Sequence, residues 1–285
     1  MRRSILITGC SSGIGYQCAH DLHNHQSRIN GVTTPTFQVI ASCRKAEDVE
    51  RLTSEGLTCI QLDLKDPSSI TKAVEETLSL TDGSIYALFN NGAYGQAGAL
   101  EDLPREALKE QFEVNLFGWH QLISELLPTM RRAGCGRIIQ NSSVLGIVAM
   151  KYRGAYNASK FAVEGWTDTL RLELRGSGIQ VSLIEPGPIE SRFRANALHS
   201  FHRWIAPEHS VHQRSYLKQI ERLAKKDSNN KFTLPSSAIV PPLLHALTAK
   251  KARVRYRVTT PTKIFALLKR LLSSKQLDFL LAKGD

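Results

Sequence analysis

A tyrosine and a lysine four residues apart are the side chains in this sequence best placed for acid–base chemistry. They are Tyr156 and Lys160, in the run Tyr-Asn-Ala-Ser-Lys. On a helix, residues at i and i+4 share one face, with Cβ atoms about 5–6 Å apart. An ammonium at that distance lowers a phenol pKa from its ordinary value of about 10, which suits proton exchange with a carbonyl or alcohol oxygen. Many solvated helices also carry such a pair, so its meaning depends on the rest of the chain.

A second group of residues, near the N-terminus, is suited to holding phosphate groups. Residues 4–8 predict a short buried strand, and a helical apolar pattern begins at Ile14. Glycines between a strand and a helix allow a tight turn and let backbone N–H groups approach a pyrophosphate. An ordinary Gly/Ser turn is the alternative. The predicted cofactor loop comprises Gly9, Ser11, Ser12, Gly13, Ile14 and Gly15.

The end of the next predicted strand carries two cations. This strand covers residues 37–43, follows a polar stretch at 23–36 that predicts a long surface loop, and ends at Arg44 and Lys45. In a dinucleotide-binding fold an acid at this strand end binds the ribose 2′-hydroxyl, whereas a cation suits a 2′-phosphate. No acid precedes Glu47, so the sequence favours NADP over NAD, with Arg44 as the main contact. A solvated Arg-Lys pair in a loop is the alternative.

Strand and helix patterns alternate through the following residues. Further strands are predicted at 57–62, 84–89, 136–140 and 179–184, and helices at 49–55, 67–80, 104–132 and 155–175. Six alternating strands predict an α/β fold with a doubly wound parallel sheet, and residues 254–258 add a seventh strand. Ligands bind such sheets at the carboxyl ends of the strands. The residues at those ends are Gly9, Arg44, Asp63, Asn90, Ser143 and Pro186.

The composition is that of an ordinary globular protein. The 285 residues are 42% apolar and 22% charged, and five scattered cysteines form no Cys-x-x-Cys pair. This argues against a disulfide framework or a zinc site and suits a reducing compartment. The N-terminus shows no signal peptide, and no apolar run reaches the roughly 18 residues of a membrane span. A cytoplasmic location is expected.

The positive charge lies in the C-terminal third. Residues 1–189 carry 18 Lys and Arg against 20 Asp and Glu, whereas residues 190–285 carry 19 against 6. Such a surface is either simply solvated or attracts phosphates, anionic lipid or nucleic acid. The sequence has no RNP, zinc-finger or basic-zipper pattern, which argues against nucleic acid.

Two segments of this third have an expected role of their own. Residues 192–234 are rich in aromatic and aliphatic side chains and predict a substrate lid for apolar molecules, or else a peripheral packed helix. Residues 261–283 predict a basic amphipathic helix that lies on a membrane surface or docks on its own domain or a subunit partner. Its apolar face comprises Ile264, Leu267, Leu268, Leu271 and Leu272.

Taken in order, the motifs resemble the short-chain dehydrogenases/reductases over residues 4–191. The glycine loop resembles the family's cofactor loop, and Tyr156 with Lys160 resembles its catalytic pair. Ser143 lies thirteen residues before Tyr156, as the family's serine does, and Asn115 matches its fourth catalytic residue. An asparagine inside an apolar helix also needs hydrogen-bond partners if it is buried.

Other parts of the chain match the family's cofactor contacts. Asp63 and Leu64 resemble the pair that contacts adenine. The loop that closes on the nicotinamide is matched by Pro186, Gly187 and Ile189, with Ser191 in place of the family's threonine. One departure is Asn90-Asn91-Gly92-Ala93, where the family has Asn-Asn-Ala-Gly. Ala93 then stands at a glycine position, which can require positive φ or close approach to the cofactor.

The resemblance implies a single Rossmann-type domain over residues 1–285 that binds NADP(H). The amino-acid sequences of its motifs resemble those of NADP-dependent aldehyde reductases and of hydroxysteroid- and retinol-dehydrogenase-like enzymes. It implies that NADPH delivers hydride to a small apolar carbonyl compound while Tyr156 donates the proton and Ser143 holds the oxygen. Lys160 would tune Tyr156 and bind the nicotinamide ribose, and Asn115 would hold a water.

The family resemblance also implies a homo-oligomer, either a dimer or a tetramer. Two alternatives to a carbonyl reductase remain at this point. One is a catalytically silent NADP-binding sensor or scaffold, and the other is a membrane-surface lipid or steroid dehydrogenase.

Overall fold

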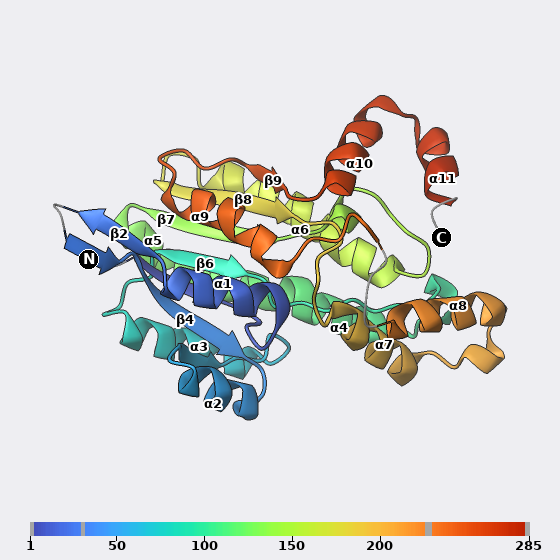
Figure 1. Cartoon of the computed structure of the whole chain (residues 1–285), viewed down its shortest axis with the longest axis horizontal. Coiled ribbons are helices and arrows are strands. Elements are labelled where there is room, and N and C mark those ends of the chain that lie inside the picture. Colours follow the sequence, from blue (N-terminus) through green and yellow to red (C-terminus); the bar gives the residue numbers. More distant parts are fainter. Residues whose placement is uncertain (1–2, 30–31, 226–229, 283–285) are drawn as a thin grey trace.

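A parallel sheet forms the centre of the computed structural model, which describes residues 3–29, 32–225 and 230–282. Its strand order is β5-β4-β1-β6-β7-β8-β9, and every neighbouring pair is parallel (Figure 1). The chain moves outward from β1 to one edge and then returns past β1 to build the other half. The strands are β1 Arg3–Ile7, β4 Phe37–Cys43, β5 Thr58–Gln61, β6 Ala87–Asn90, β7 Gly136–Asn141, β8 Ile179–Glu185 and β9 Arg255–Arg257.

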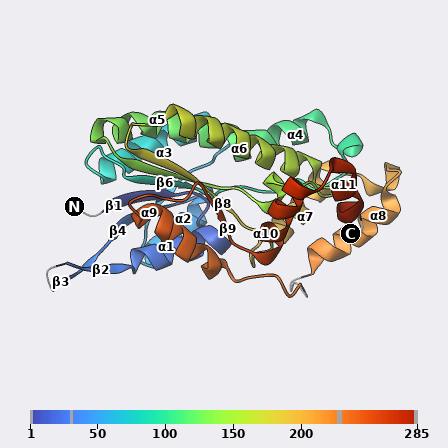
Figure 2. The same ribbon diagram turned by 90° about the horizontal axis from the view of Figure 1, so that it is seen from above.

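Helices cover both faces of this sheet, as the view from above in Figure 2 shows. One face carries α3, α5 and α6, and the other carries α1, α2 and α9. This arrangement confirms the predicted doubly wound α/β fold. The helices of the described residues are α1 Gly13–His23, α2 Ala46–Ser54, α3 Pro67–Leu80, α4 Arg105–Phe112, α5 Gly118–Ala133, α6 Gly154–Glu173, α7 Phe193–Trp204, α8 Gln213–Ala224, α9 Val240–Thr248, α10 Thr260–Leu271 and α11 Ser274–Ala282.

The alternation of side chains along β1 shows why both layers form. Leu6 points into the cluster beneath α3, α5 and α6, whereas Ile5 and Ile7 point into the cluster beneath α1 and α9. All three side chains are fully buried. A strand buried on both faces reads as a continuous apolar run, which is what the sequence shows here.

The polar stretch at residues 23–36 was wrongly expected to be a loop. It forms an antiparallel hairpin of β2 Gln26–Ile29 and β3 Val32–Pro35, separate from the main sheet. The sequence signal for it was Asn30-Gly31, a dipeptide typical of two-residue hairpin turns. Those two residues lie outside the described part of the chain.

The C-terminal segment 261–283 was expected to be one amphipathic helix and is two. Leu272 is extended, with φ −98° and ψ 145°, so it ends α10 before α11 begins at Ser274. In Figure 1 this pair projects from the body beyond the last strand. Residue 283 lies outside the described residues, and in the described part of the chain no helix is long and apolar enough to cross a bilayer.

Gly118, the first residue of α5, provides a test of how tightly α5 packs against the loop after β5. A Cβ at Gly118 would come within 2.2 Å of the Leu64 carbonyl oxygen. We expect Gly118→Ala to lower the free energy of unfolding by about 1–3 kcal/mol, because neither backbone can yield cheaply. Urea unfolding measures this change.

Gly165 is the matched control, because it lies within α6 and a Cβ there meets nothing within 4 Å. Gly165→Ala should stabilise the protein by about 0.5–1 kcal/mol, since alanine is the better helix former. Equal effects of the two substitutions would contradict the close approach at Leu64.

Candidate active site

The carboxyl ends of the strands open into a groove of about 400 Å³. Five residues predicted to bind the cofactor line it: Gly9, Ser11, Arg44, Asp63 and Leu64. They come from the ends of β1, β4 and β5, as the parallel sheet requires. The groove also contains Gly92 and Ala93, where the sequence departs from the family motif, and four residues of the expected lid: Asn196, His199, Ser200 and Arg203. The residues that the sequence had not indicated are Thr8, Ser42, Leu62, Lys65, Tyr94, Glu110 and Val114.

The glycines of the predicted cofactor loop are required by close backbone contacts. Gly9 has φ +71°, and a Cβ on it would lie 2.5 Å from the Gly92 Cα. A Cβ on Gly15 would lie 2.3 Å from the Gly9 carbonyl oxygen. Gly13, with φ +61°, would place a Cβ 2.9 Å from the Ser191 Cβ. The loop therefore lies directly against the segment that follows β8, as expected for Ser191.

The exchange of alanine and glycine at residues 92 and 93 does not force Ala93 into the left-handed backbone region. Among the described residues other than glycine, positive φ occurs at Asp82 and Tyr152 and not at Ala93. Gly92 is the residue that needs to be small, because a Cβ there would approach the Gly9 nitrogen to 3.2 Å. The Thr8 hydroxyl holds this turn by accepting from the Gly92 nitrogen at 2.8 Å.

The groove presents polar groups of the kind that a dinucleotide needs. Two buried hydroxyls in its wall, Ser42 Oγ and Tyr94 OH, have no hydrogen-bond partner. Lys65 and Arg203 both pair with Glu110, at 2.9 and 2.8 Å. Within the described residues, the Arg44 guanidinium makes no ion pair and is available for an anion.

The other predicted cofactor residues differ in where the structure places them. Lys45 lies 3.8 Å from Glu47 and is not part of the groove wall. Asn90 donates to Gln140 at 2.8 Å, and its Oδ1 is buried without a partner. In the loop after β8, Pro186 accepts from the Val144 nitrogen at 2.7 Å. Ile189 forms a bridge with Leu234, and a Cβ on Gly187 would meet the Thr259 hydroxyl at 2.2 Å.

Helix α6 carries Tyr156 and Lys160, the two residues predicted to be catalytic, and both side chains are buried. Tyr156 packs with Val144, Leu145 and Val148, in and beside the short turn that follows β7. The Lys160 ammonium donates to the Asn141 carbonyl oxygen at 2.7 Å. It lies 4.5 Å from the Trp119 ring centroid and 5.7 Å from that of Tyr156.

The pKa values of this pair differ from the expectation. Burial raises the pKa of Tyr156 to about 12, although a hydrogen bond with Ser143 works against the rise. Burial lowers the pKa of Lys160 to about 7, against the opposing attraction of Glu164. The expectation that Lys160 lowers the tyrosine pKa is therefore wrong for this structure. Tyr156 is therefore protonated at neutral pH and has a proton to donate, although the raised pKa makes it a weaker acid than an exposed tyrosine.

Asn115 lies in a π-helical turn, Glu113–Phe117, between α4 and α5. Its Oδ1 accepts from the Tyr94 nitrogen at 3.2 Å, and its Nδ2 donates to the Tyr94 carbonyl at 3.0 Å and to Ser159 Oγ at 3.1 Å. These bonds supply the partners that a buried asparagine needs. They connect the groove residue Tyr94 to α6 one residue before Lys160.

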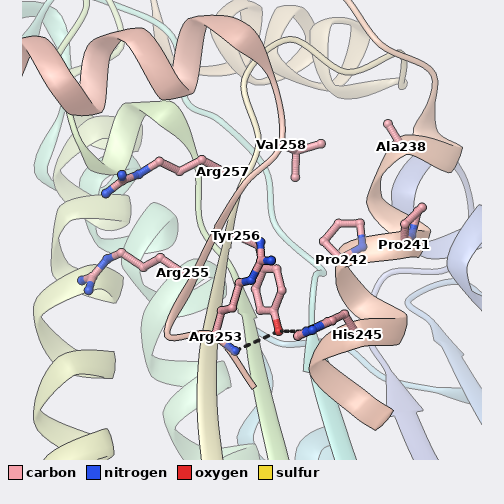
Figure 3. A pocket seen from close by; sticks show the side chains of 9 residues that line it. All are labelled: Ala238, Pro241, Pro242, His245, Arg253, Arg255, Tyr256, Arg257 and Val258. Carbon is pink, nitrogen blue, oxygen red and sulfur yellow. Dashed lines mark hydrogen bonds between the residues drawn. The ribbon is translucent and has the colours of Figure 1, made fainter. Parts of the chain in front are cut away.

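A charged cluster that the sequence did not reveal includes Glu164, whose charge acts on Lys160. Arg255 pairs with Glu164, Asp168 and Glu185 at 2.8–3.1 Å, and Arg257 pairs with Glu185 at 3.1 Å. Figure 3 shows both arginines pointing away from Tyr256, whose hydroxyl meets His245 at 2.7 Å. Burial and the nearby Glu185 raise the pKa of Glu164 to about 7.

Side chains from segments far apart in the sequence lie around Tyr156. The Phe193 ring, at the start of α7, lies 5.1 Å from the Tyr156 ring. Three C-terminal side chains, Phe265, Leu277 and Leu281, pack against the cluster that contains Tyr156. Their apolar pattern in the sequence was equally consistent with a surface helix, so these three residues were not predicted to belong to the site.

The expected lid at 192–234 folds largely on itself. Phe201, Ile205, Tyr216 and Leu223 of α7, α8 and the segment between them form one cluster with Ala97 and Ala99. The Tyr216 hydroxyl anchors it, donating to Asp102 and accepting from the Ala99 nitrogen at 2.9 Å. Residues 226–229 of the expected lid lie outside the described residues.

The lowered pKa of Lys160 predicts a pH-dependent stability. Between pH about 7, its folded value, and 10.5, its unfolded value, the folded chain binds fewer protons, so stability rises with pH in this window. This contribution is at most about 1.4 kcal/mol per pH unit, and Lys160→Met removes it.

Urea unfolding of both proteins at about pH 6 and about pH 9 measures the effect. The native protein should gain stability relative to the methionine variant as the pH rises. A difference that stays constant with pH would rule out the lowered pKa.

Comparisons with known proteins agree with this geometry. A family model described as short chain dehydrogenase matches residues 3–200. The chain is 42% identical over 281 residues to the uncharacterized oxidoreductase YbbO of Escherichia coli (strain K12), covering 99% of this chain and 94% of that one. It is 32% identical over 279 residues to human 17-beta-hydroxysteroid dehydrogenase type 1, covering 90% of this chain and 78% of that one.

Solved structures show the same fold at low sequence identity. A short-chain dehydrogenase/reductase from Burkholderia phymatum in complex with NAD matches with a TM-score of 0.76 at 21% identity, covering 99% of this chain and 95% of that one. A variant of actinorhodin polyketide ketoreductase with NADPH matches at 0.70 and 22%, covering 90% and 95%. With the family model and the relatives, the chain belongs to the short-chain dehydrogenase family, oxidoreductases that act on CH–OH groups with a nicotinamide cofactor.

Proposed function

We propose that this protein reduces the carbonyl group of an apolar aldehyde or ketone to an alcohol, or catalyses the reverse reaction, with NADP(H). The observation that carries the proposal is a buried, protonated Tyr156 beside Ser143, next to a groove that fits a dinucleotide. The nicotinamide cofactor, when bound, supplies or accepts the hydride, and the chain supplies position and protons.

Tyr156 acts as the acid in the direction of reduction. As the carbonyl carbon gains a hydride, its C=O π electrons move to oxygen, and Tyr156 donates the proton that completes the alcohol. Ser143 donates a hydrogen bond to the same oxygen and stabilises the charge that develops there. Because burial holds the tyrosine pKa at about 12, Tyr156 carries its proton at any neutral pH.

Lys160 is placed to hold the cofactor ribose and to compensate the tyrosinate left after proton transfer. Its ammonium is held by the carbonyl oxygen of Asn141, the last residue of β7. Asn115 acts as a positioning residue through Ser159 and Tyr94, which border Lys160 and the groove. We propose that it also holds the water through which Lys160 exchanges protons with solvent.

The preference for NADP over NAD rests on Arg44. It lies at the end of β4 and lines the groove, and its guanidinium is free for a 2′-phosphate. Asp63, on the neighbouring strand end, accepts from the Lys65 nitrogen at 3.0 Å. Arginine binds phosphate through charge-assisted bidentate hydrogen bonds, which an NAD ribose hydroxyl cannot match.

The preference for an apolar substrate rests on the wall around Tyr156. That wall consists of aliphatic and aromatic side chains from the turn after β7, from α7 and from α10 and α11: Val144, Leu145, Val148, Phe193, Phe265, Leu277 and Leu281. Burying an aliphatic or aromatic substrate against such side chains contributes about 25 cal/mol per Å² of apolar surface. A silent cofactor sensor has no need of the Ser143, Tyr156 and Lys160 arrangement, which argues against that alternative.

Replacing Tyr156 by phenylalanine tests the reaction assigned to it. Tyr156→Phe should lower kcat for an aldehyde at least 10²–10⁴-fold, because general acid catalysis is lost, while the affinity for NADPH is retained. NADPH oxidation and fluorescence titration measure the two quantities. Tyr152→Phe is the matched control, since the Tyr152 ring packs on His212 and Tyr216. Retained turnover in Tyr156→Phe would refute the assignment.

Replacing Arg44 by alanine tests the cofactor preference. Arg44→Ala should raise the Kd for NADPH roughly 10–100-fold, because a charge-assisted hydrogen bond contributes about 1.5–3 kcal/mol. The Kd for NADH should not change. Lys45→Ala, which removes the neighbouring cation outside the groove wall, should have little effect on either cofactor. If native protein binds NADH as tightly as NADPH, the assignment of Arg44 is wrong.

A further inference from the structure

The outward side of the C-terminal helix pair exposes an unusual number of large apolar side chains. They are Ile264, Leu267, Leu271, Phe279 and Leu280, each of which leaves 43–70% of its surface exposed. The three on α10 recur at i, i+3 and i+7, so they form one stripe along the helix. We call these five residues the outer face of the pair.

The opposite side of the pair is fixed to the body of the protein. Thr262 and Ala266 are buried, and Phe265, Leu277 and Leu281 pack against the cluster that contains Tyr156. Lys269 donates to the Ile147 carbonyl oxygen at 2.5 Å and lies 4.4 Å from the Phe161 ring centroid. Because these contacts use the inner side, the helices cannot turn their outer face inward.

Positive charge borders the outer face. At 100° per residue, Lys263 and Arg270 fall on the same side of α10, directly beside the apolar stripe. Both are exposed, and Lys275 adds an exposed cation at the start of α11. Across residues 260–282 the sequence contains a single acid, Asp278. The face therefore combines apolar side chains with a local excess of cations.

We propose that the outer face of the α10–α11 pair docks on the surface of an anionic lipid bilayer. An amphipathic helix with cations beside its apolar face lies in the headgroup region, where the apolar side chains enter the acyl boundary and the cations meet anionic headgroups. Neither helix can span the bilayer, since no helix in the described ranges is long and apolar enough to do so. The pair lies on the membrane and does not cross it.

A second copy of this chain is a poorer occupant of the same face. A two-fold interface brings the same patch of both subunits together, so Lys263, Arg270 and Lys275 of each copy would approach one another. Like charges brought together at an interface cost several kcal/mol. Anionic headgroups have the complementary charge, and their acyl chains accept the leucines and phenylalanine.

Docking would also place the reaction near the lipid. Tyr156 packs on the inner side of the same helices, so it would lie about one helix diameter, roughly 10 Å, from the membrane surface. This consequence rests on the proposed function, whereas the docking does not. Because the experiment below reads binding and not turnover, the two can fail separately.

Co-sedimentation of the full-length protein with vesicles tests the proposal. The protein should sediment with vesicles of phosphatidylcholine that contain phosphatidylglycerol, and much less with phosphatidylcholine alone. Raising the salt concentration should weaken the binding, because the charges act near the surface and are screened. If no protein sediments with the anionic vesicles at low salt, the proposal is overturned.

Two variants separate the apolar and the charged parts of the face. Leu267→Glu combined with Leu271→Glu should lower the partition coefficient at least about 10-fold, because two leucines lose their burial in the acyl boundary. Lys263→Gln combined with Arg270→Gln should remove most of the preference for anionic vesicles. Both pairs are exposed positions, so circular dichroism should show unchanged folding.

Leu172→Glu is the matched control, since Leu172 on α6 is 69% exposed and lies outside the pair. It should leave vesicle binding unchanged. Equal binding by the native protein and the Leu267/Leu271 variant would overturn the proposal. So would analytical ultracentrifugation that shows a native dimer and a monomeric Leu267/Leu271 variant in the absence of lipid, because a second copy would then cover the face.

Discussion

The buried ammonium of Lys160 ties together the elements on which the site depends. It joins α6 to the last residue of β7 through the Asn141 carbonyl, and it stacks on Trp119 of α5. Burying an ammonium is costly unless its hydrogen bonds are supplied, and here the low pKa of about 7 expresses that cost. The carboxyl group of Glu164, which is paired with Arg255, opposes this lowering of the lysine pKa but does not offset it.

The cofactor groove depends on a different constraint, which is close approach of backbone to backbone. Gly9, Gly15 and Gly92 occupy a region where a Cβ would lie 2.3–3.2 Å from a neighbouring backbone atom. The exchanged order of glycine and alanine at residues 92 and 93 keeps the small residue where this contact occurs. Rigid turns of this kind hold donors and hydroxyls in place before a ligand arrives, so less ordering entropy is lost on binding.

The C-terminal helices α10 and α11 contribute both to the surroundings of Tyr156 and to the protein surface. Their inner side completes the apolar wall beside Tyr156, and their outer side exposes leucines among cations. Residues of α10 and α11 thus contribute to the same site as residues 143–160. Side chains of α7, α10 and α11 accordingly lie around Tyr156, which itself comes from α6.

The sequence by itself determined the parallel sheet and the residues at its carboxyl edge, because strand–helix alternation and glycine spacing are local patterns. It also predicted Tyr156, Lys160, Ser143 and Asn115 as catalytic residues, and the structure brings Tyr156 close to Ser143 and Lys160. Only the tertiary structure decided the tyrosine pKa, because burial beside Val144, Leu145 and Val148 raises it more than the hydrogen bond with Ser143 lowers it. The same holds for Phe265, Leu277 and Leu281, whose place beside Tyr156 depends on how the chain returns after β9, which no local pattern encodes.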